Sequence, residues 1–268
     1  MARHRRLERL TDFQRALKNK YGLGAGEEYK PWLRVQDVKS KGNSGKIQGI
    51  KVNREHHTLS ENESCLFYLV ENCDSVIDIR EQFPLLPLDF SIKIAKNLDI
   101  NHPKVPGSGS YNVMTTDFVL TCTDKHDFWY EAISVKSAQE LSIKRTAEKL
   151  EIERIWWELL GVNFHIYTMN EISVIQSKNI QWFTSAYRQG RRFKESIEKQ
   201  AIKTLHVGIN LIEDICNGFC KNVDVKNDEA LVLLKHLIAI KKVEVDLSKP
   251  IAESGVIDIT NILSSIGR

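Results

Sequence analysis

The stretch that decides the fold is VMTTDFVL, residues 113–120, taken together with AISVK at residues 132–136. In the first segment Asp117 interrupts an otherwise apolar β-strand pattern. In the second, Ser134 and Lys136 share one strand face, because side chains alternate along a strand. An unpaired charge inside an apolar strand costs on the order of several kcal/mol, so these residues need a compensating partner. A divalent metal ion would be a sufficient one.

The acid and the lysine have two interpretations. One is a partly buried salt bridge between Asp117 and Lys136, or positions just past their strand ends. The other is a degenerate form of the nuclease pattern D-x(n)-(D/E)-x-K, with Ser134 in place of the second acid. Mg²⁺ takes oxygen ligands and keeps several waters, one of which becomes the nucleophile, and two ions about 4 Å apart can assist both reacting oxygens. Spacing alone leaves both interpretations open.

The segments around these strands alternate between helix and strand. Ser60 is predicted to be the N-cap of a helix, because Glu63 stands three residues later and an apolar run follows. The remaining patterns predict a strand at 76–83, strands at 111–122 and 128–136, a helix at 138–160 ended by Gly161, and a strand at 164–167. This order of elements indicates an α/β fold.

After Met169 the strand patterns give way to helical ones. The sequence predicts helices at 180–188, 193–206, 209–219 and 228–240, followed by two alternating strands at 243–247 and 256–259. Such a terminal hairpin after several helices is typical of a winged helix-turn-helix domain. We therefore predict two domains: an α/β catalytic domain at 1–168, with a basic helix and linker at 1–28, and a mostly helical, winged-helix-like domain at 169–268 that binds DNA or a partner.

Positive charge is concentrated in two segments. The formal net charge is only +3, but residues 1–20 hold seven Lys or Arg against two acids, and residues 188–203 hold six against two. Either segment could follow DNA phosphates, whose neutralisation supplies sequence-independent affinity, or could be a solvated helix face. Between the basic start and the main domain we expect an extended piece at 29–38 and an exposed loop or hairpin at 39–49.

Composition excludes several classes of protein. No run approaches the ~18 apolar residues of a membrane span, and the start MARHRRLERL lacks the apolar stretch of a secretory signal. We therefore expect a cytoplasmic protein with no membrane partner. Five cysteines without a Cys-x-x-Cys pair favour reduced thiols over a disulfide framework or a structural zinc site.

Two further acids are candidates for the site. Glu63 is explained by its capping box alone, but a carboxylate in the first turn of a helix can also face a neighbouring sheet edge. Glu153, on the helix predicted at 138–160, is either solvated and ion-paired or a supporting member of the site.

Four segments resemble the TnsA endonuclease family of heteromeric cut-and-paste transposons. They are YKPWLRVQDV at 29–38, HTLSENE at 57–63, DIREQFPLLP at 78–87 and TTDF at 115–118. The resemblance is strong over residues 29–167 and general in layout beyond them. It implies that the first domain has a restriction-endonuclease-like fold.

The resemblance also implies a set of residues around one Mg²⁺ site: Glu63, Asp117, Ser134, Lys136, Glu153 and the main-chain carbonyl of Val135. Glu63, Asp117 and Lys136 are the implied catalytic residues, and the two carboxylates and the carbonyl are the implied metal ligands. Ser134 is a poorer ligand than a carboxylate, so its direct role is open. Glu153 matches a family position on the helix after Lys136 and is kept as a supporting residue.

The family's reaction is hydrolysis at the 5′ ends of a transposon, so the resemblance implies a metal-dependent DNA endonuclease that uses Mg²⁺, replaceable by Mn²⁺, with two ions. Its implied partners are transposon-end DNA, an RNase H-like transposase of the TnsB type that cuts and joins the 3′ ends, and an AAA+ ATPase regulator of the TnsC type. Two alternatives remain: a stand-alone restriction or repair nuclease, and a non-catalytic DNA-binding assembly protein with a decayed site, for which Ser134 is the best support.

Overall fold

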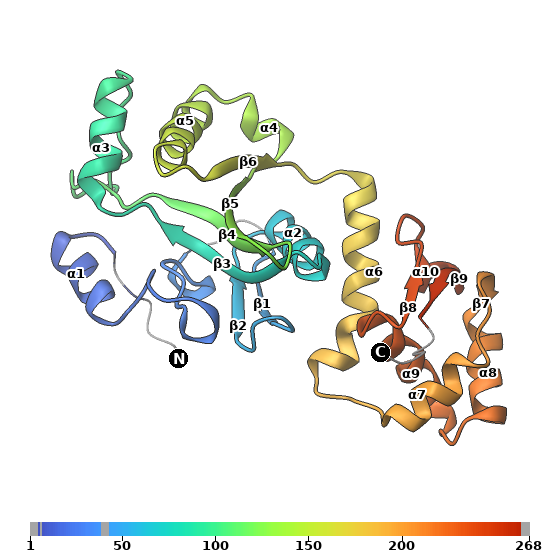
Figure 1. Cartoon of the computed structure of the whole chain (residues 1–268). Helices are drawn as coiled ribbons and strands as arrows, with labels where there is room; N and C mark the ends of the chain where they lie inside the picture. The colour runs from blue at the N-terminus through green and yellow to red at the C-terminus, as the bar shows by residue number, and fades with distance from the viewer. Residues whose placement is uncertain (1–4, 6, 39–42, 264–268) are drawn as a thin grey trace. The chain divides into compact units, whose positions relative to one another are not determined.

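A computed structural model describes residues 5, 7–38 and 43–263 of the chain (Figure 1). The chain divides into two compact units, residues 1–169 and 170–268. The sequence placed the boundary between residues 168 and 169. Within the described ranges, no helix is both long and apolar enough to cross a membrane.

A four-stranded sheet forms the centre of the N-terminal unit, in the order β3-β4-β5-β6. Its strands are β3 (Val76–Pro84), β4 (Thr115–Thr123), β5 (Phe128–Val135) and β6 (Asn163–Tyr167). The first three pair antiparallel, whereas β6 runs parallel to β5, because the chain returns to the same end of the sheet through a helix. All four strands were predicted, and the mixed α/β class is confirmed.

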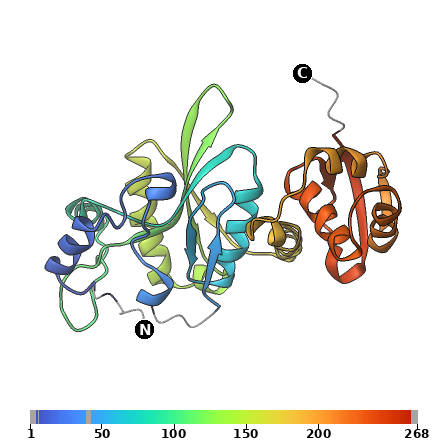
Figure 2. The same ribbon diagram turned by 90° about the horizontal axis from the view of Figure 1, so that it is seen from below.

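Helices lie on both sides of this sheet, with α2 and α5 opposite one another (Figures 1 and 2). The helices are α2 (Glu61–Asn72), α3 (Leu88–Asn97), α4 (Ala138–Leu141) and α5 (Lys144–Glu158). The main core forms where Val119 and Ala132 of the sheet pack against Ile152 and Trp156 of α5 and Ile94 of α3. This packing fixes α5 against the sheet and so fixes the position of any polar side chain that α5 turns toward β5.

Shorter elements complete the N-terminal unit: α1 (Leu10–Lys18), the 3₁₀ turns η1 (Gly26–Glu28) and η2 (Val35–Asp37), and the hairpin strands β1 (Gly45–Gln48) and β2 (Glu55–Thr58). Helix α1 confirms part of the predicted basic helix, although residues 1–4 and 6 lie outside the described residues. The extended piece predicted at 29–38 is wrong at residues 35–37, where η2 turns the chain, whereas Tyr29, Arg34 and Val38 are extended. Residues 39–42 of the predicted loop or hairpin also lie outside the described residues.

The hairpin that joins β4 to β5 projects beyond the rest of the sheet (Figure 2). Strand β6 begins opposite Glu131, so the first residues of β5 pair with β4 alone. Phe128, at the start of β5, is 71% exposed. Asp117, near the start of β4, and Val135, the last residue of β5, lie at the opposite end of the two strands from this hairpin turn.

One helix prediction in this unit was wrong, and one helix was not predicted. The helix predicted at 138–160 is broken at Ser142, whose Oγ donates to the carbonyl of Gln139 at 2.7 Å and competes with the helical backbone pattern. Helix α3 was missed, because Phe90, Ile92 and Ile94 alternate with polar residues as they would in a strand. The strand predicted at 111–122 begins only at Thr115.

The C-terminal unit combines helices with a three-stranded antiparallel sheet in the order β7-β9-β8. Its elements are α6 (Glu171–Arg188), α7 (Glu195–Ile202), β7 (Gly208–Leu211), α8 (Ile212–Asn222), α9 (Asn227–Ala239), β8 (Val243–Val245), α10 (Ile251–Ser254) and β9 (Val256–Ile262). Phe219, Leu233, Leu237 and Ile257 are almost fully buried and form much of its interior.

The predicted terminal hairpin is confirmed, since β8 and β9 pair antiparallel. The helix predicted at 209–219 is wrong in its first residues, which form β7 and pair with β9. Helix α6 begins at Glu171 rather than at Ile180, because Asn170 and Ser173 form a capping box that the sequence analysis overlooked.

Candidate active site

Asp117 lies at the centre of a hydrogen-bonded cluster at one edge of the sheet. Its Oδ2 accepts from the backbone N–H of Val135 at 2.7 Å, from Lys136 Nζ at 2.9 Å and from Ser134 Oγ at 3.3 Å. The pairing of β4 with β5 brings these residues together, because it places the start of one strand beside the end of the other. The ion pair between Asp117 and Lys136 that the sequence left open is therefore present.

Ser134 connects this cluster to helix α5. The side chain is buried, and its Oγ lies 3.3 Å from both Asp117 Oδ2 and Glu153 Oε2. Glu153 is only 4% exposed, and its Oε1 has no hydrogen-bond partner among the described residues. Burial, and then the charge of Asp117, raise the pKa of Glu153 to about 8. The solvated interpretation of Glu153 is therefore wrong, and α5 turns this acid toward the site.

Glu63 performs its capping function and also faces the site. Its backbone N–H donates to Ser60 Oγ at 3.2 Å, while its carboxylate accepts from Ser60 Oγ at 2.9 Å and from the N–H of Leu59 at 2.9 Å. The N-cap predicted at Ser60 is confirmed. Burial, followed by repulsion from Asp117, raises the pKa of Glu63 to about 7. The two carboxylates therefore lie close enough to repel each other, and Lys136 offsets only part of this effect on Glu63.

Gln82 links these two carboxylates, a role that was not predicted from the sequence. Its Nε2 lies 3.2 Å from Asp117 Oδ1 and 3.4 Å from Glu63 Oε2, and its Oε1 accepts from Thr115 Oγ1 at 3.0 Å. The residue is buried and has a φ of +49° in the middle of β3. A left-handed conformation at a residue other than glycine is unfavourable by about 1 to 3 kcal/mol and persists where the surroundings enforce it. Its place in the segment DIREQFPLLP was the one available signal.

Lys136 is positioned through both its side chain and its backbone. Besides Asp117, its Nζ donates to the carbonyl of Val135 at 2.7 Å and to Ser134 Oγ at 3.1 Å. Its backbone N–H donates to the carbonyl of Tyr167, the last residue of β6, at 3.0 Å. The hydroxyl of Tyr167 lies 3.3 Å from Cys65 Sγ on α2, the helix that carries Glu63. Burial opposes the charge on Lys136, but Asp117 outweighs it and raises the pKa of the ammonium group.

A second charged cluster supports the hairpin next to the site. Glu81 is fully buried and accepts two hydrogen bonds from Arg54, at 2.8 and 2.5 Å, and one contact of 3.0 Å from His56 Nδ1. Burial opposes its charge, but these partners lower the pKa of Glu81 to about 2. Because every charge here is paired, we assign this cluster a structural role, joining β2 to β3 beside Gln82.

The oxygen donors at the site fit a divalent cation. Mg²⁺ binds through one or two protein carboxylates and keeps several waters, so it does not need a full protein cage. Glu63 and Asp117 share one neutral donor, Gln82, and burial and the charge of Asp117 raise the pKa of Glu63 to about 7 even though Lys136 pairs with Asp117. No group of three or more His, Cys, Asp or Glu side chains with metal-binding geometry occurs among the described residues. Carboxylate and carbonyl oxygens of this kind are ligands that a hydrated hard cation accepts.

Comparison with known proteins gives matches to both units. A family model described as TnsA-like endonuclease N terminal matches residues 73–169, and one described as TnsA endonuclease C terminal matches residues 171–247. The transposon Tn7 transposition protein TnsA of Escherichia coli is 39% identical over 214 residues, which span 80% of this chain and 76% of that protein. The first match includes Asp117, Lys136 and Glu153 but begins after Glu63.

Proposed function

The chain belongs to the TnsA endonuclease family of DNA transposition, and from this premise we propose that it hydrolyses the 5′ ends of a transposon with the help of Mg²⁺. The observation that carries the proposal is the single cluster in which Glu63, Asp117, Ser134, Lys136 and Glu153 meet. The members of this cluster come from α2, β4, the end of β5 and α5, and the fold brings them together.

In this proposal Glu63, Asp117 and the main-chain carbonyl of Val135 would hold Mg²⁺, which Mn²⁺ can replace, and the family resemblance implies two ions. When bound, the metal supplies a Lewis acid for the phosphate and lowers the pKa of the attacking water. Lys136 presents an ammonium group held within 2.9 Å of Asp117, and this charge stabilises the negative charge that develops at phosphorus. Gln82 keeps the two carboxylates apart and oriented.

Ser134 and Glu153 act on the site from behind Asp117. Ser134 has no charge to offer a metal, so its hydrogen bonds orient Asp117. Position 134 carries a serine where the nuclease pattern has an acid, and the Glu153 carboxyl contacts Asp117 only indirectly, through Ser134 Oγ. We propose that the pair shapes the pocket and that neither contacts the reacting atoms.

The fold supports the finer assignments as well. The sheet with helices on both sides and catalytic groups at one edge is consistent with a restriction-endonuclease-like domain over residues 1–168. In the C-terminal unit, the order α7, β7, α8, α9, β8, α10, β9 with sheet order β7-β9-β8 supports a winged-helix-like domain at 169–268. We propose transposon-end DNA, a TnsB-type RNase H-like transposase and a TnsC-type AAA+ regulator as partners, in the bacterial cytoplasm.

The test is 5′-end cleavage by the full chain, alone and with the partner proteins, in Mg²⁺ or Mn²⁺. Asp117→Ala should abolish 5′ cleavage and Mn²⁺ binding, measured by electron paramagnetic resonance, while partner binding remains. Asp127→Ala, an acid-to-alanine change at the exposed turn of the same hairpin, is the matched control and should leave both unchanged. Near-normal cleavage by Asp117→Ala in the assembled complex would refute the site.

The same assay separates the two alternatives. Efficient cleavage without partners would identify a stand-alone nuclease. Absence of cleavage and of Mn²⁺ binding by the wild-type chain in the complete complex would identify an assembly protein with a decayed site. The ion pair between Lys136 and Asp117 is the observation that favours this second candidate, because it neutralises Asp117 without a metal.

A further inference from the structure

Gln82 stands opposite Asp117 in the sheet but outside the regular pairing. Strands β3 and β4 pair on either side of it, at Glu81 and at Phe83. Its φ of +49° is left-handed, and its backbone carbonyl accepts a hydrogen bond from the N–H of Trp32 at 3.2 Å. Strained backbone of this kind persists only where the surroundings enforce it, and it gathers at functional sites. We therefore expect the side chain at this position to have a function that the strain serves.

The side chain of Gln82 is held between two carboxylates. It is 2% exposed, and its Nε2 lies 3.2 Å from Asp117 Oδ1 and 3.4 Å from Glu63 Oε2. The amide nitrogen donates in both contacts, because carboxylate oxygens accept. The amide oxygen faces the other way, and Oε1 accepts from Thr115 Oγ1 at 3.0 Å. Both polar atoms of the amide therefore have partners.

A cation bound by Glu63 and Asp117 would meet the wrong end of this amide. The N–H bonds present the positive end of the amide dipole, whereas Mg²⁺ and Mn²⁺ take oxygen ligands. The oxygen and the nitrogen are bonded to the same carbon of Gln82. A half-turn about the last side-chain bond therefore exchanges them without moving the rest of the residue.

Thr115 is a suitable partner for both orientations of the amide. A hydroxyl group has one donor site and two acceptor sites, and its hydrogen rotates to suit the neighbour. Thr115 Oγ1 donates to the Gln82 oxygen as observed, and it can accept from the Gln82 nitrogen after the half-turn. The amide can therefore turn without leaving a buried polar atom unpaired, which would be costly.

We propose that Gln82 is a metal ligand of the nuclease site, and that its amide turns to present Oε1 to the cation that Glu63 and Asp117 hold. The inference rests on the proposed function, because it takes a divalent cation at these two carboxylates. With its nitrogen toward them, Gln82 hydrogen-bonds both acids; with its oxygen toward them, it adds an oxygen to the donor set. This oxygen offsets the acid that the nuclease pattern has at position 134, where this chain has Ser134.

Two substitutions of similar length separate a ligand from a residue that only orients the acids through its N–H group. Gln82→Glu keeps an oxygen and removes the donor, whereas Gln82→Met removes both polar groups. Mn²⁺ binding by the full chain, measured by electron paramagnetic resonance, should be on the order of tenfold weaker in Gln82→Met. In Gln82→Glu it should be at least as tight as in the wild type. With EDTA the order reverses, and Gln82→Glu should unfold at lower urea than Gln82→Met, because a third buried carboxylate then faces the first two.

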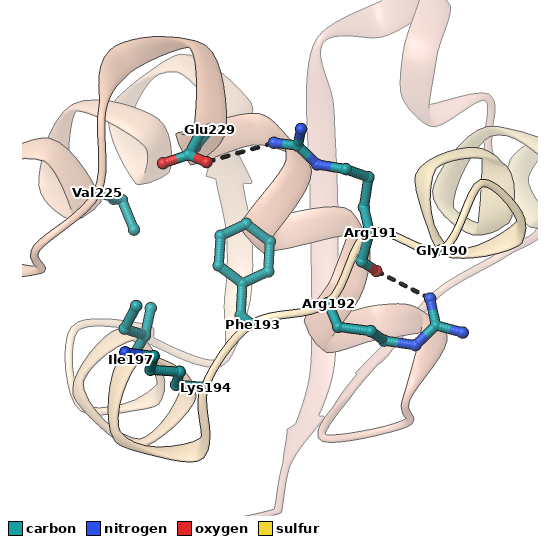
Figure 3. Close-up of a pocket in the computed structure, with 8 residues that line it drawn as sticks. All are labelled: Gly190, Arg191, Arg192, Phe193, Lys194, Ile197, Val225 and Glu229. Carbon is teal, nitrogen blue, oxygen red and sulfur yellow. Dashed lines mark hydrogen bonds and ion pairs between the residues drawn. The ribbon is translucent and has the colours of Figure 1, made fainter.

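Controls test the amide-to-acid change and binding to other acids. Gln48→Glu makes the same change at an exposed position of β1 and should match the wild type in both measurements. In the C-terminal unit, Glu229 pairs with Arg191 at 3.3 Å beside a cavity of about 400 Å³ (Figure 3). Because this carboxylate already has a cation, Glu229→Gln should leave Mn²⁺ binding unchanged. If Gln82→Glu is unfolded in EDTA, Mn²⁺ should refold it, since a ligand that binds only the folded chain stabilises it.

Three results would overturn the proposal: Mn²⁺ binding as weak in Gln82→Glu as in Gln82→Met, wild-type affinity in Gln82→Met, or an unfolded Gln82→Glu that Mn²⁺ does not refold. Each of them leaves the proposed function standing if the wild type binds Mn²⁺ and Asp117→Ala does not. If the wild type binds no Mn²⁺, or Asp117→Ala binds it equally well, the metal site fails and the role of Gln82 fails with it.

Discussion

Replacing Glu153 by glutamine should stabilise the N-terminal unit, and increasingly so as the pH rises. The pKa of this buried carboxyl is raised to about 8 from an ordinary 4.5, first by burial and then by Asp117. Below pH 4.5 the acid is protonated in both the folded and the unfolded chain, so it does not change the free energy of unfolding with pH. Between pH 4.5 and 8 only the unfolded chain loses its proton, so stability falls, and above pH 8 the loss is complete. A tenfold difference in proton affinity corresponds to about 1.4 kcal/mol, which gives a penalty on the order of 5 kcal/mol.

The penalty can be measured by urea unfolding with EDTA at pH 5, 7 and 9, followed by tryptophan fluorescence. Trp156 and Trp157 lie in the core beside Glu153 and report on this unit. The advantage of Glu153→Gln over wild type should grow by several kcal/mol from pH 5 to pH 9, whereas any cost of fitting the amide stays constant with pH. Glu151→Gln, on the same helix but paired with Arg154 at the surface, should show no such growth. A difference that is flat with pH would refute the reasoning.

Three further changes test the site and the two units. Ser134→Ala should slow 5′ cleavage about tenfold, which corresponds to about 1.4 kcal/mol of activation free energy. Lys136→Ala should slow it about a thousandfold, near 4 kcal/mol, because this change removes the charge beside the phosphate. Equal small losses in the single-turnover rates of the two variants would contradict this. Gln82→Ala and Gln82→Gly should both weaken Mn²⁺ binding and cleavage. In urea unfolding, the free energy of unfolding of the glycine variant should exceed that of the alanine variant by about 1 kcal/mol, because glycine accepts the positive φ. If the alanine variant is the more stable one, the backbone at this position is not strained. A chain ending at Ile172 should lose the ATPase regulator in a pull-down while keeping Mn²⁺ binding, and unchanged capture would place the regulator's contact in the nuclease unit.

The strands and the cap of α2 could be predicted because they depend on local patterns. Alternation along β3 and β5 and the Ser60–Glu63 pair survive in the structure. The same reliance on local pattern failed for α3, where residues 88–97 alternate like a strand but pack as a helix against α5. Tertiary packing determines that residues 88–97 form a helix, and a short stretch of sequence does not reveal that packing.

The site was predictable in its members but not in its connections. Asp117 and Lys136 stand out because charge interrupts apolar strands. The burial of Glu153 and the bridge through Ser134 depend on how α5 seats on the sheet. Gln82 could not be found at all from spacing, since its role follows from a left-handed backbone turn inside β3.

The hydrogen bond from Lys136 to Tyr167 has a consequence for the protein while it is still being made. Tyr167 closes the parallel strand β6 and also touches α2, so the site lacks its last support until that residue has left the ribosome. At about 5 to 20 residues per second, translation takes roughly 5 to 20 s to pass from Glu63 to Tyr167. During that interval the nascent chain contains Glu63 but not yet Tyr167, whose carbonyl accepts a hydrogen bond from Lys136. A chain that ends before Tyr167 would lack the backbone hydrogen bond to Lys136 and the contact with Cys65 on α2.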